Sequence, residues 1–126
     1  MKSDPLTSAQ VRQLREGLAL FNRGDFFECH EVLESVWLEA SGEDKVFLQG
    51  LIQVAVSFYH LRRRNFAGSS RLLRAALEKL ASPSECRHLI DTATLLETLQ
   101  PLPERIEAGQ VSPETPAPEI CFLSAL

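Results

Sequence analysis

The pattern of hydrophobic and polar positions is clearest between Val46 and Leu61, a run of sixteen residues without a charged side chain. Three of its polar residues, Gln49, Gln53 and His60, fall within an arc of roughly 40° on a helix that turns about 100° per residue. A helix that is apolar almost all round is normally buried at the centre of a fold. We therefore expect a central helix whose narrow, uncharged polar stripe points into the protein or into a pocket.

Two amphipathic helices are expected before this run. Thr7 and Gln10 have the spacing of a capping box, which predicts a first helix from there to about residue 21. Gly24 suits the stop that follows, and Asp25 suits the N-cap of a second helix ending near Ala40. The expected inward face of that second helix is Phe26, His30, Leu33, Trp37 and Ala40.

Three further helices are expected from the central run onward. The third should span about 44–64, and the fourth about 66–80 after a break at Asn65. Ser82-Pro83-Ser84-Glu85 has the signature of a helix start, which predicts a fifth helix to about Leu99. Its expected inward residues are Leu89, Ala93 and Leu96.

The composition changes after Gln100. Five prolines between Pro101 and Pro118 exclude a long helix, although 103–108 could form one short helical turn. The last residues, 120–126, are apolar again, so we expect them to pack on the bundle or on a second subunit. The predicted fold is all-α, with a five-helix bundle domain at 1–100 and a proline-rich extension at 101–126.

A shift of forty residues aligns the first hairpin with the second. The aligned apolar pairs are Leu14 with Val54, Leu18 with Phe58, Phe21 with Leu61, Phe26 with Phe66, Leu33 with Leu73, and Trp37 with Leu77. This agreement favours two similar hairpins, each loosely like a tetratricopeptide-type hairpin, packed in a closed small bundle. Chance agreement between two amphipathic hairpins is the alternative.

Charge and cysteine content limit the classes of function. The net charge of −4 argues against a general nucleic-acid-binding protein. The arginines at 62–64 are expected to complement a helix dipole rather than to bind an anion or RNA. Three widely spaced cysteines favour neither a disulfide framework nor a zinc knuckle. With no signal peptide and a central run poorly suited to a membrane, a cytoplasmic protein is expected, without membrane partners.

Candidate chemistry is concentrated in the second helix. Glu34 lies about 40° from His30 on the helix, so both are expected inside the apolar stripe, where an unpaired carboxylate is costly. The spacing resembles the His-Glu-x-x-His zinc helix with Glu34 in place of the second histidine. His30, Glu34 and His60 are therefore candidate ligands of a divalent metal ion, and Glu31 is a candidate general base.

The alternative is a structural one. His30 and His60 could be core histidines hydrogen-bonded to Gln49, Gln53, Glu34 and the indole of Trp37. A buried network of this kind satisfies polar groups and fixes helix register.

The two motifs together resemble a known family. They are FNxGxFFExHExLExxW at 21–37 and FLQGLIQxA at 47–55, followed by Tyr59-His60. They resemble domain of unknown function three hundred and nine, a small bacterial and archaeal helical family often labelled predicted metal-dependent hydrolase. The resemblance implies a compact all-helical domain. By motif position it implies a site made of His30, Glu31, Glu34, Gln49, Gln53 and His60.

Two functions follow from these observations. One is a metal-assisted hydrolase or small-molecule-binding protein, with Gln49, Gln53, Trp37 and Tyr59 as candidate ligand-binding residues. The other is a non-enzymatic helical interaction or assembly module, expected to be a homodimer because of its apolar tail.

Overall fold

The computed structural model describes residues 4–123, which form six α-helices and one 3-10 helix. The elements in chain order are α1 (Ser8–Asn22), α2 (Phe26–Glu39), α3 (Gly42–Arg62), α4 (Phe66–Leu80), η1 (Cys86–Leu89), α5 (Thr92–Leu99) and α6 (Leu102–Glu107). Within this range the β-type pairing consists of one isolated bridge, between Ile90 and Phe122. The all-α prediction is therefore confirmed. None of the described helices is long and apolar enough to cross a membrane.

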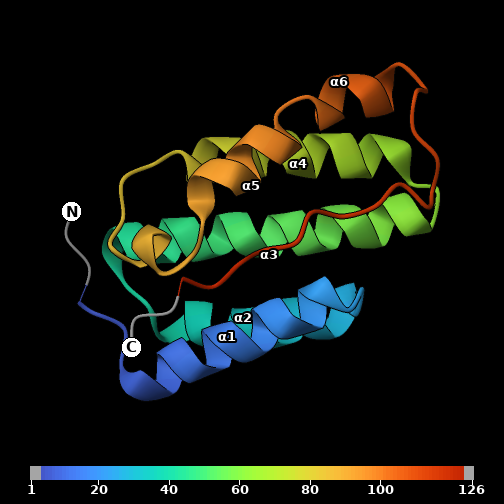
Figure 1. Cartoon of the computed structure of the whole chain (residues 1–126). Coiled ribbons are helices and arrows are strands. Elements are labelled where there is room, and N and C mark those ends of the chain that lie inside the picture. The colour runs from blue at the N-terminus through green and yellow to red at the C-terminus, as the bar shows by residue number, and fades with distance from the viewer. Residues whose placement is uncertain (1–3, 124–126) are drawn as a thin grey trace.

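α3 is the central helix of the bundle. It lies between α1 and α2 on one side and α4, α5 and α6 on the other (Figure 1). Eleven of its 21 residues are buried, and Phe47, Leu48, Val54 and Ala55 are completely shielded from solvent. Burial on several sides explains why this segment carries apolar residues almost all round.

The two helical hairpins, α1–α2 and α3–α4, have the same turn. The middle residue of each three-residue turn has a positive φ, 85° at Gly24 and 65° at Arg64. The N–H of the next residue donates to the carbonyl oxygen five positions earlier, at 2.9 Å in both turns. That residue is the N-cap of the second helix in each hairpin, Asp25 before α2 and Asn65 before α4. The prediction of two similar hairpins, forty residues apart, is confirmed.

The start of the chain follows its sequence signal. The Thr7 hydroxyl accepts the N–H of Gln10, and the Gln10 side chain accepts the N–H of Thr7, so the predicted capping box is present. Asp25 occupies the predicted N-cap position of α2 but makes no side-chain capping bond. Its carboxylate lies 3.4 Å from Nε of Arg23 instead.

The prediction of one continuous fifth helix is wrong. Oδ1 of the buried Asp44 accepts the N–H groups of Glu85 and Cys86 at 3.0 and 2.9 Å, which fixes the loop after α4 on the start of α3. The backbone is then extended at Ile90, and Asp91 caps α5 by accepting the N–H of Thr94. The start signal therefore produced only the short 3-10 helix, and α5 begins nine residues later than expected.

The later start of α5 also changes its inward face. Leu95 and Leu99 are buried, whereas Ala93, which was expected inside, is exposed. The expected inward residues Leu89 and Leu96 are only partly buried.

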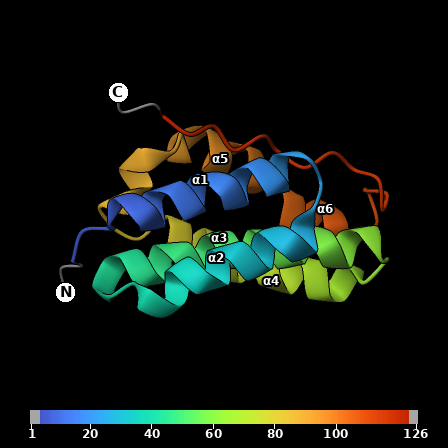
Figure 2. The same cartoon turned by 90° about the horizontal axis from the view of Figure 1, so that it is seen from below.

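The C-terminal segment runs back along the bundle as an extended strap of residues 110–123 (Figure 2). Ile120 is 3% exposed, and the Asn22 side chain holds it by accepting its N–H and donating to its carbonyl. The guanidinium of Arg15 lies over the ring of Phe122. Residues 120–123 therefore pack on the bundle of their own chain, and residues 124–126 of the predicted docking segment lie outside the described range. The short helix expected at 103–108 is α6. The domain boundary at residue 100 stays a prediction.

Candidate ligand-binding site between α2 and α3

The buried face of α2 differs from the expected one. Its buried residues are Phe26, Cys29, Leu33 and Val36. The centre of this face lies about 80° around the helix from His30. His30 is therefore at the edge of the core, with 26% of its side chain exposed, and Glu34 lies further round, with 52% exposed. The expectation that Glu34 lies inside the apolar stripe is wrong.

His30 and His60 nevertheless meet at one small cavity between α2 and α3. The cavity has a volume of about 110 Å³ and is lined by Phe26, Phe27, His30, Val56, Tyr59 and His60. Its rings touch in series. The ring centroids are 5.6 Å apart for Phe27 and His30, 5.7 Å for Phe27 and Tyr59, and 6.0 Å for Tyr59 and His60. Of the residues expected to face a shared space between α2 and α3, the two histidines line this cavity, whereas Gln49, Gln53 and Glu34 do not.

The hydrogen bonds of Asn65 determine which nitrogen of His60 carries the proton. Oδ1 of Asn65 accepts the N–H of Gly68 at 3.0 Å, so its Nδ2 faces Nδ1 of His60 at 3.2 Å. An amide nitrogen only donates, so Nδ1 of His60 accepts and a neutral ring carries its proton on Nε2. His60 therefore offers an N–H donor at Nε2.

The predicted metal ligands are only partly brought together. Nε2 of His30 lies 3.8 Å from Oε2 of Glu34, within one turn of α2. His60 would need its proton on Nδ1 to ligate a metal through Nε2, which would break its bond with Asn65. No group of three or more His, Cys, Asp and Glu side chains in residues 4–123 is placed to hold a metal ion. Glu31, the candidate base, is exposed. These donors do not fit a preassembled metal centre, and metal binding stays a prediction.

The closed polar network predicted as the alternative is not formed either. Gln49 and Gln53 are partly buried, but Oε1 of Gln53 is buried and has no hydrogen-bond partner among the described residues. Trp37 lies under the ammonium of Lys45, which is 4.5 Å from its ring centroid. The polar stripe of α3 is inward-facing as expected, yet an acceptor within it remains unpaired.

Two arginines at the C-terminal end of α3 stack on rings of the cavity wall. The guanidinium carbon of Arg62 lies 5.3 Å from the centroid of Phe26, and that of Arg63 lies 5.3 Å from the centroid of Tyr59. Arg62 also donates to the carbonyls of Pro113 and Thr115 in the strap, and its partial burial lowers its pKa. Sequence reasoning assigned these arginines only to the helix dipole. The four-residue spacing of Tyr59 and Arg63 was a signal that they share a helix face.

Asn65 and the apolar wall residues Phe27 and Val56 were also not singled out from the sequence. In the sequence, Asn65 is an ordinary residue for a helix N-cap. Its second hydrogen bond, to His60, depends on the turn geometry. Phe27 is 49% exposed, which is unusual for a large apolar side chain and marks the mouth of the cavity.

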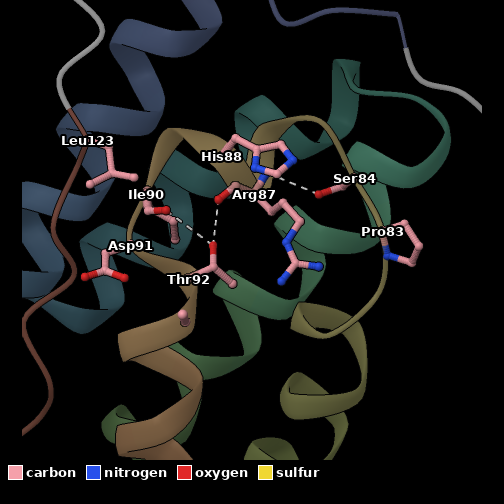
Figure 3. Close-up of a pocket in the computed structure, with 9 residues that line it drawn as sticks. Pro83, Ser84, Arg87, His88, Ile90, Asp91, Thr92 and Leu123 are labelled. Atoms are coloured by element: carbon pink, nitrogen blue, oxygen red, sulfur yellow. Dashed lines mark hydrogen bonds between the residues drawn. The ribbon is translucent and has the colours of Figure 1, made fainter.

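A larger hollow of about 500 Å³ lies between the loop after α4 and the strap (Figure 3). Its hydroxyl groups bond within the loop itself: Thr92 Oγ1 donates to the Arg87 carbonyl at 2.7 Å, and Ser84 Oγ accepts the Arg87 N–H at 3.2 Å. Those bonds shape the break between η1 and α5. None of the site residues predicted from the sequence lines this hollow, so the smaller cavity is the candidate site.

The buried thiols do not provide a nucleophile. Burial raises the pKa of Cys29 to about 12, and burial together with the nearby Asp44 carboxylate raises the pKa of Cys86 further. Both thiols therefore stay protonated near neutral pH and act as packing groups.

Two known proteins and one family profile are similar to parts of this chain. YpuF, an uncharacterised protein of Bacillus subtilis (strain 168), is 40% identical over 86 residues, or 66% of this chain and 49% of YpuF. An uncharacterised protein of Aquifex aeolicus (strain VF5) is 32% identical over 76 residues, or 60% of this chain and 23% of that protein. The chain thus spans about half of YpuF and less of the other relative. The profile described as domain of unknown function (DUF309) matches residues 14–72, a region that contains every residue lining the α2–α3 cavity. Residues 14–72 of this chain are thus similar to the DUF309 family.

Proposed function

We propose that this protein is a ligand-binding helical domain and that the cavity between α2 and α3 is its binding site. The observation that carries the proposal is that His30 and His60, from two different helices, line one cavity with aromatic walls. Binding pockets combine mostly apolar walls with a few placed polar groups, and this cavity has that composition.

Unsatisfied polar groups near the cavity support binding over a purely structural role. His60 uses Nδ1 for Asn65 and has Nε2–H left to donate, while His30 makes only a 3.8 Å contact with Glu34. Histidines that served only to fix helix register would be expected to bond to their buried neighbours.

The volume limits what can enter. A cavity of roughly 150 Å³ holds a benzene molecule, and this one is about 110 Å³. The group that enters is therefore no larger than a single ring or a short branched chain. It is either a small ligand or one compact part of a larger one that extends past Phe27 into solvent.

An NMR screen of the full chain tests the proposal. Small ring-containing and branched probes should shift the backbone amides of residues 26–30 and 56–60 in particular. Val56→Phe fills the cavity and should abolish those shifts, whereas Val46→Phe, at an exposed site near the start of α3, should leave them unchanged. Shifts that persist in Val56→Phe, or the absence of any at these residues, would contradict the proposal.

A metal-assisted hydrolase is the second candidate, favoured by the His30–Glu34 contact on one turn of α2. His30, Glu34 and His60 would be its ligands, and Glu31 its base. The test is metal analysis of protein purified without a histidine tag, together with the melting temperature after adding zinc, manganese or iron. Bound metal that is lost in Glu34→Gln would establish a metal site containing Glu34 and so support this function. No metal and an unchanged melting temperature would remove it.

An assembly module loses one of its two supports. The apolar tail was the reason to expect a homodimer, but Ile120 is buried against its own chain. The tetratricopeptide-like hairpins remain as its support. The exposed apolar residues Phe27 and Leu38 of α2 and Val46 of α3 offer a surface for such an assembly. Light scattering at increasing concentration tests it, because a dimer held by this surface should dissociate in Leu38→Glu.

A further inference from the structure

Positive and negative side chains are unequally placed around the α2–α3 cavity. Since this cavity is the binding site proposed above, their placement identifies a class of ligand. Arg62 stacks on Phe26 and Arg63 on Tyr59, so two of the rings in the cavity wall carry a guanidinium. Arg62 is engaged by two strap carbonyls, at 2.9 and 2.8 Å. Arg63 makes no ion pair within the described part of the chain and is exposed. It is a cation held beside the cavity by its ring contact alone.

The acidic groups of α2 do not cancel this charge. Glu34 lies against His30, 3.8 Å from its Nε2, and Glu28 and Glu31 are exposed and do not line the cavity. The groups facing an occupant from α3 are the rings of Tyr59 and His60 and the apolar side chain of Val56. An occupant therefore meets apolar walls, one N–H donor and a neighbouring cation.

From this arrangement we infer that the ligand is a small organic carboxylate with a compact apolar body. The apolar body enters the cavity between Phe26, Phe27 and Val56. The carboxylate remains at the rim, where it accepts a hydrogen bond from Nε2–H of His60 and pairs with the guanidinium of Arg63. A carboxylate accepts both contacts at once, because each of its oxygens can receive separate donors.

Asn65 is a positioning residue for this ligand. Its amide holds His60 with the proton on Nε2, which is the form that donates to an anion. An aspartate at this position would accept from Nδ1–H instead and leave Nε2 with a lone pair. That form repels a carboxylate and suits a metal ion. The residue at position 65 thus selects between the two kinds of ligand.

A cation in an aromatic cage is the competing class, because Phe26, Phe27 and Tyr59 offer several ring faces. The two guanidiniums already stacked on Phe26 and Tyr59 disfavour it, since a third cation beside them is repelled. The probes that test for carboxylate binding also distinguish a carboxylate ligand from a cationic one.

The experiment is an NMR titration of the full chain with matched probes. Isovalerate and benzoate are compared with their neutral analogues 3-methyl-1-butanol and benzyl alcohol, and with tetramethylammonium. The carboxylates should bind about tenfold more tightly than the alcohols. Arg63→Gln should remove that difference while the alcohols bind as before. Arg71→Gln, which removes an exposed arginine of α4, should change neither.

Asn65→Asp adds a readout that a merely structural role would not move. The ¹⁵N shifts of the His60 ring should report the proton on Nε2 in the parent protein and on Nδ1 in the variant. Carboxylate binding should weaken in the variant, and added zinc should perturb His60 only there. An unchanged ring tautomer in Asn65→Asp would overturn the role of Asn65.

The outcomes separate this inference from the binding proposal on which it rests. If the alcohols bind as tightly as the acids and Arg63→Gln has no effect, the cavity remains a binding site and the carboxylate inference is overturned. If tetramethylammonium binds best and Val56→Phe abolishes it, the ligand is a cation. If no probe binds in a way that depends on Val56, the binding proposal itself is wrong.

Discussion

The two hairpins of this bundle share a backbone design but differ in the side chains that they contribute to the cavity. Forty residues separate equivalent positions, and both turns use a positive φ at the same place. The residues equivalent to Phe27, His30, Tyr59 and His60 in the other hairpin are Ala67, Ser70, Ala19 and Leu20. The equivalent positions thus carry no imidazole and no aromatic ring. Aromatic and imidazole side chains on α2 and α3, rather than the backbone of the hairpin, create the candidate site.

The contacts inside the hairpins differ in a second way. In α3–α4, Ser57 Oγ is buried and lies 3.0 Å from both the carbonyl oxygen and the hydroxyl oxygen of Ser69. The equivalent pair in α1–α2 is Gly17 and Cys29, both buried. In α3–α4 a hydrogen bond joins the two helices at this position. In α1–α2 the helices pack closely there because Gly17 has no side chain. This difference predicts unequal responses to substitution.

The largest effect is expected from Gly17→Val. A Cβ at Gly17 would lie 2.8 Å from Cδ2 of the buried Leu33, so a branched side chain must push α1 away from α2. We expect a loss of about 3 kcal/mol in the free energy of unfolding, measured by urea denaturation. Ala19→Val on the exposed side of the same helix is the control. Equal losses in both variants would show helix propensity, not packing, to be the cause.

A smaller loss is expected from Ser57→Ala in the second hairpin. The substitution removes the buried bond to Ser69 without adding volume, and the cost should be about 1–2 kcal/mol. Urea denaturation measures it, and Ser57→Ala combined with Ser69→Ala completes a double-mutant cycle. Additive losses in the cycle would mean that the two hydroxyls are not coupled.

Substitutions at the two equivalent turn residues should change the stability of the protein in opposite directions. Gly24→Ala forces a side chain into a positive φ and should cost about 1 kcal/mol, because a Cβ disfavours this conformation. Arg64→Gly relieves the same strain in the second turn and should stabilise by up to about 1 kcal/mol, although the glycine adds freedom to the unfolded chain. Thermal unfolding compares the pair. A loss of stability in Arg64→Gly would mean that the Arg64 side chain makes a favourable interaction that outweighs the strain.

The smallest effect on stability is expected from His30→Ala. His30 is partly exposed, and its polar contact among the described residues is the loose one with Glu34, so the loss should stay below about 1 kcal/mol. Probe binding at the α2–α3 cavity should nevertheless weaken. A loss of 1–3 kcal/mol with unchanged binding would instead support a structural role.

The pattern of the sequence was sufficient for the architecture. The Thr7–Gln10 capping box depends only on neighbours within one helical turn. The repeat at forty residues depends on the periodic burial of apolar side chains. They correctly predicted α1 to α4 and the meeting of His30 with His60. The all-round apolar run at 46–61 also identified α3 as central, because only a helix contacted on several sides buries such a surface.

Tertiary contacts decided the rest. Asp44 binding to the N–H groups of Glu85 and Cys86, with the pairing of Ile90 and Phe122, divided the predicted fifth helix, and both contacts join residues more than thirty positions apart. Helical periodicity alone also could not choose between Cys29 and His30 as the centre of the buried face of α2. Periodicity gives the spacing of a stripe but not its rotation, which depends on the helices packed against it, and that rotation left Glu34 in solvent.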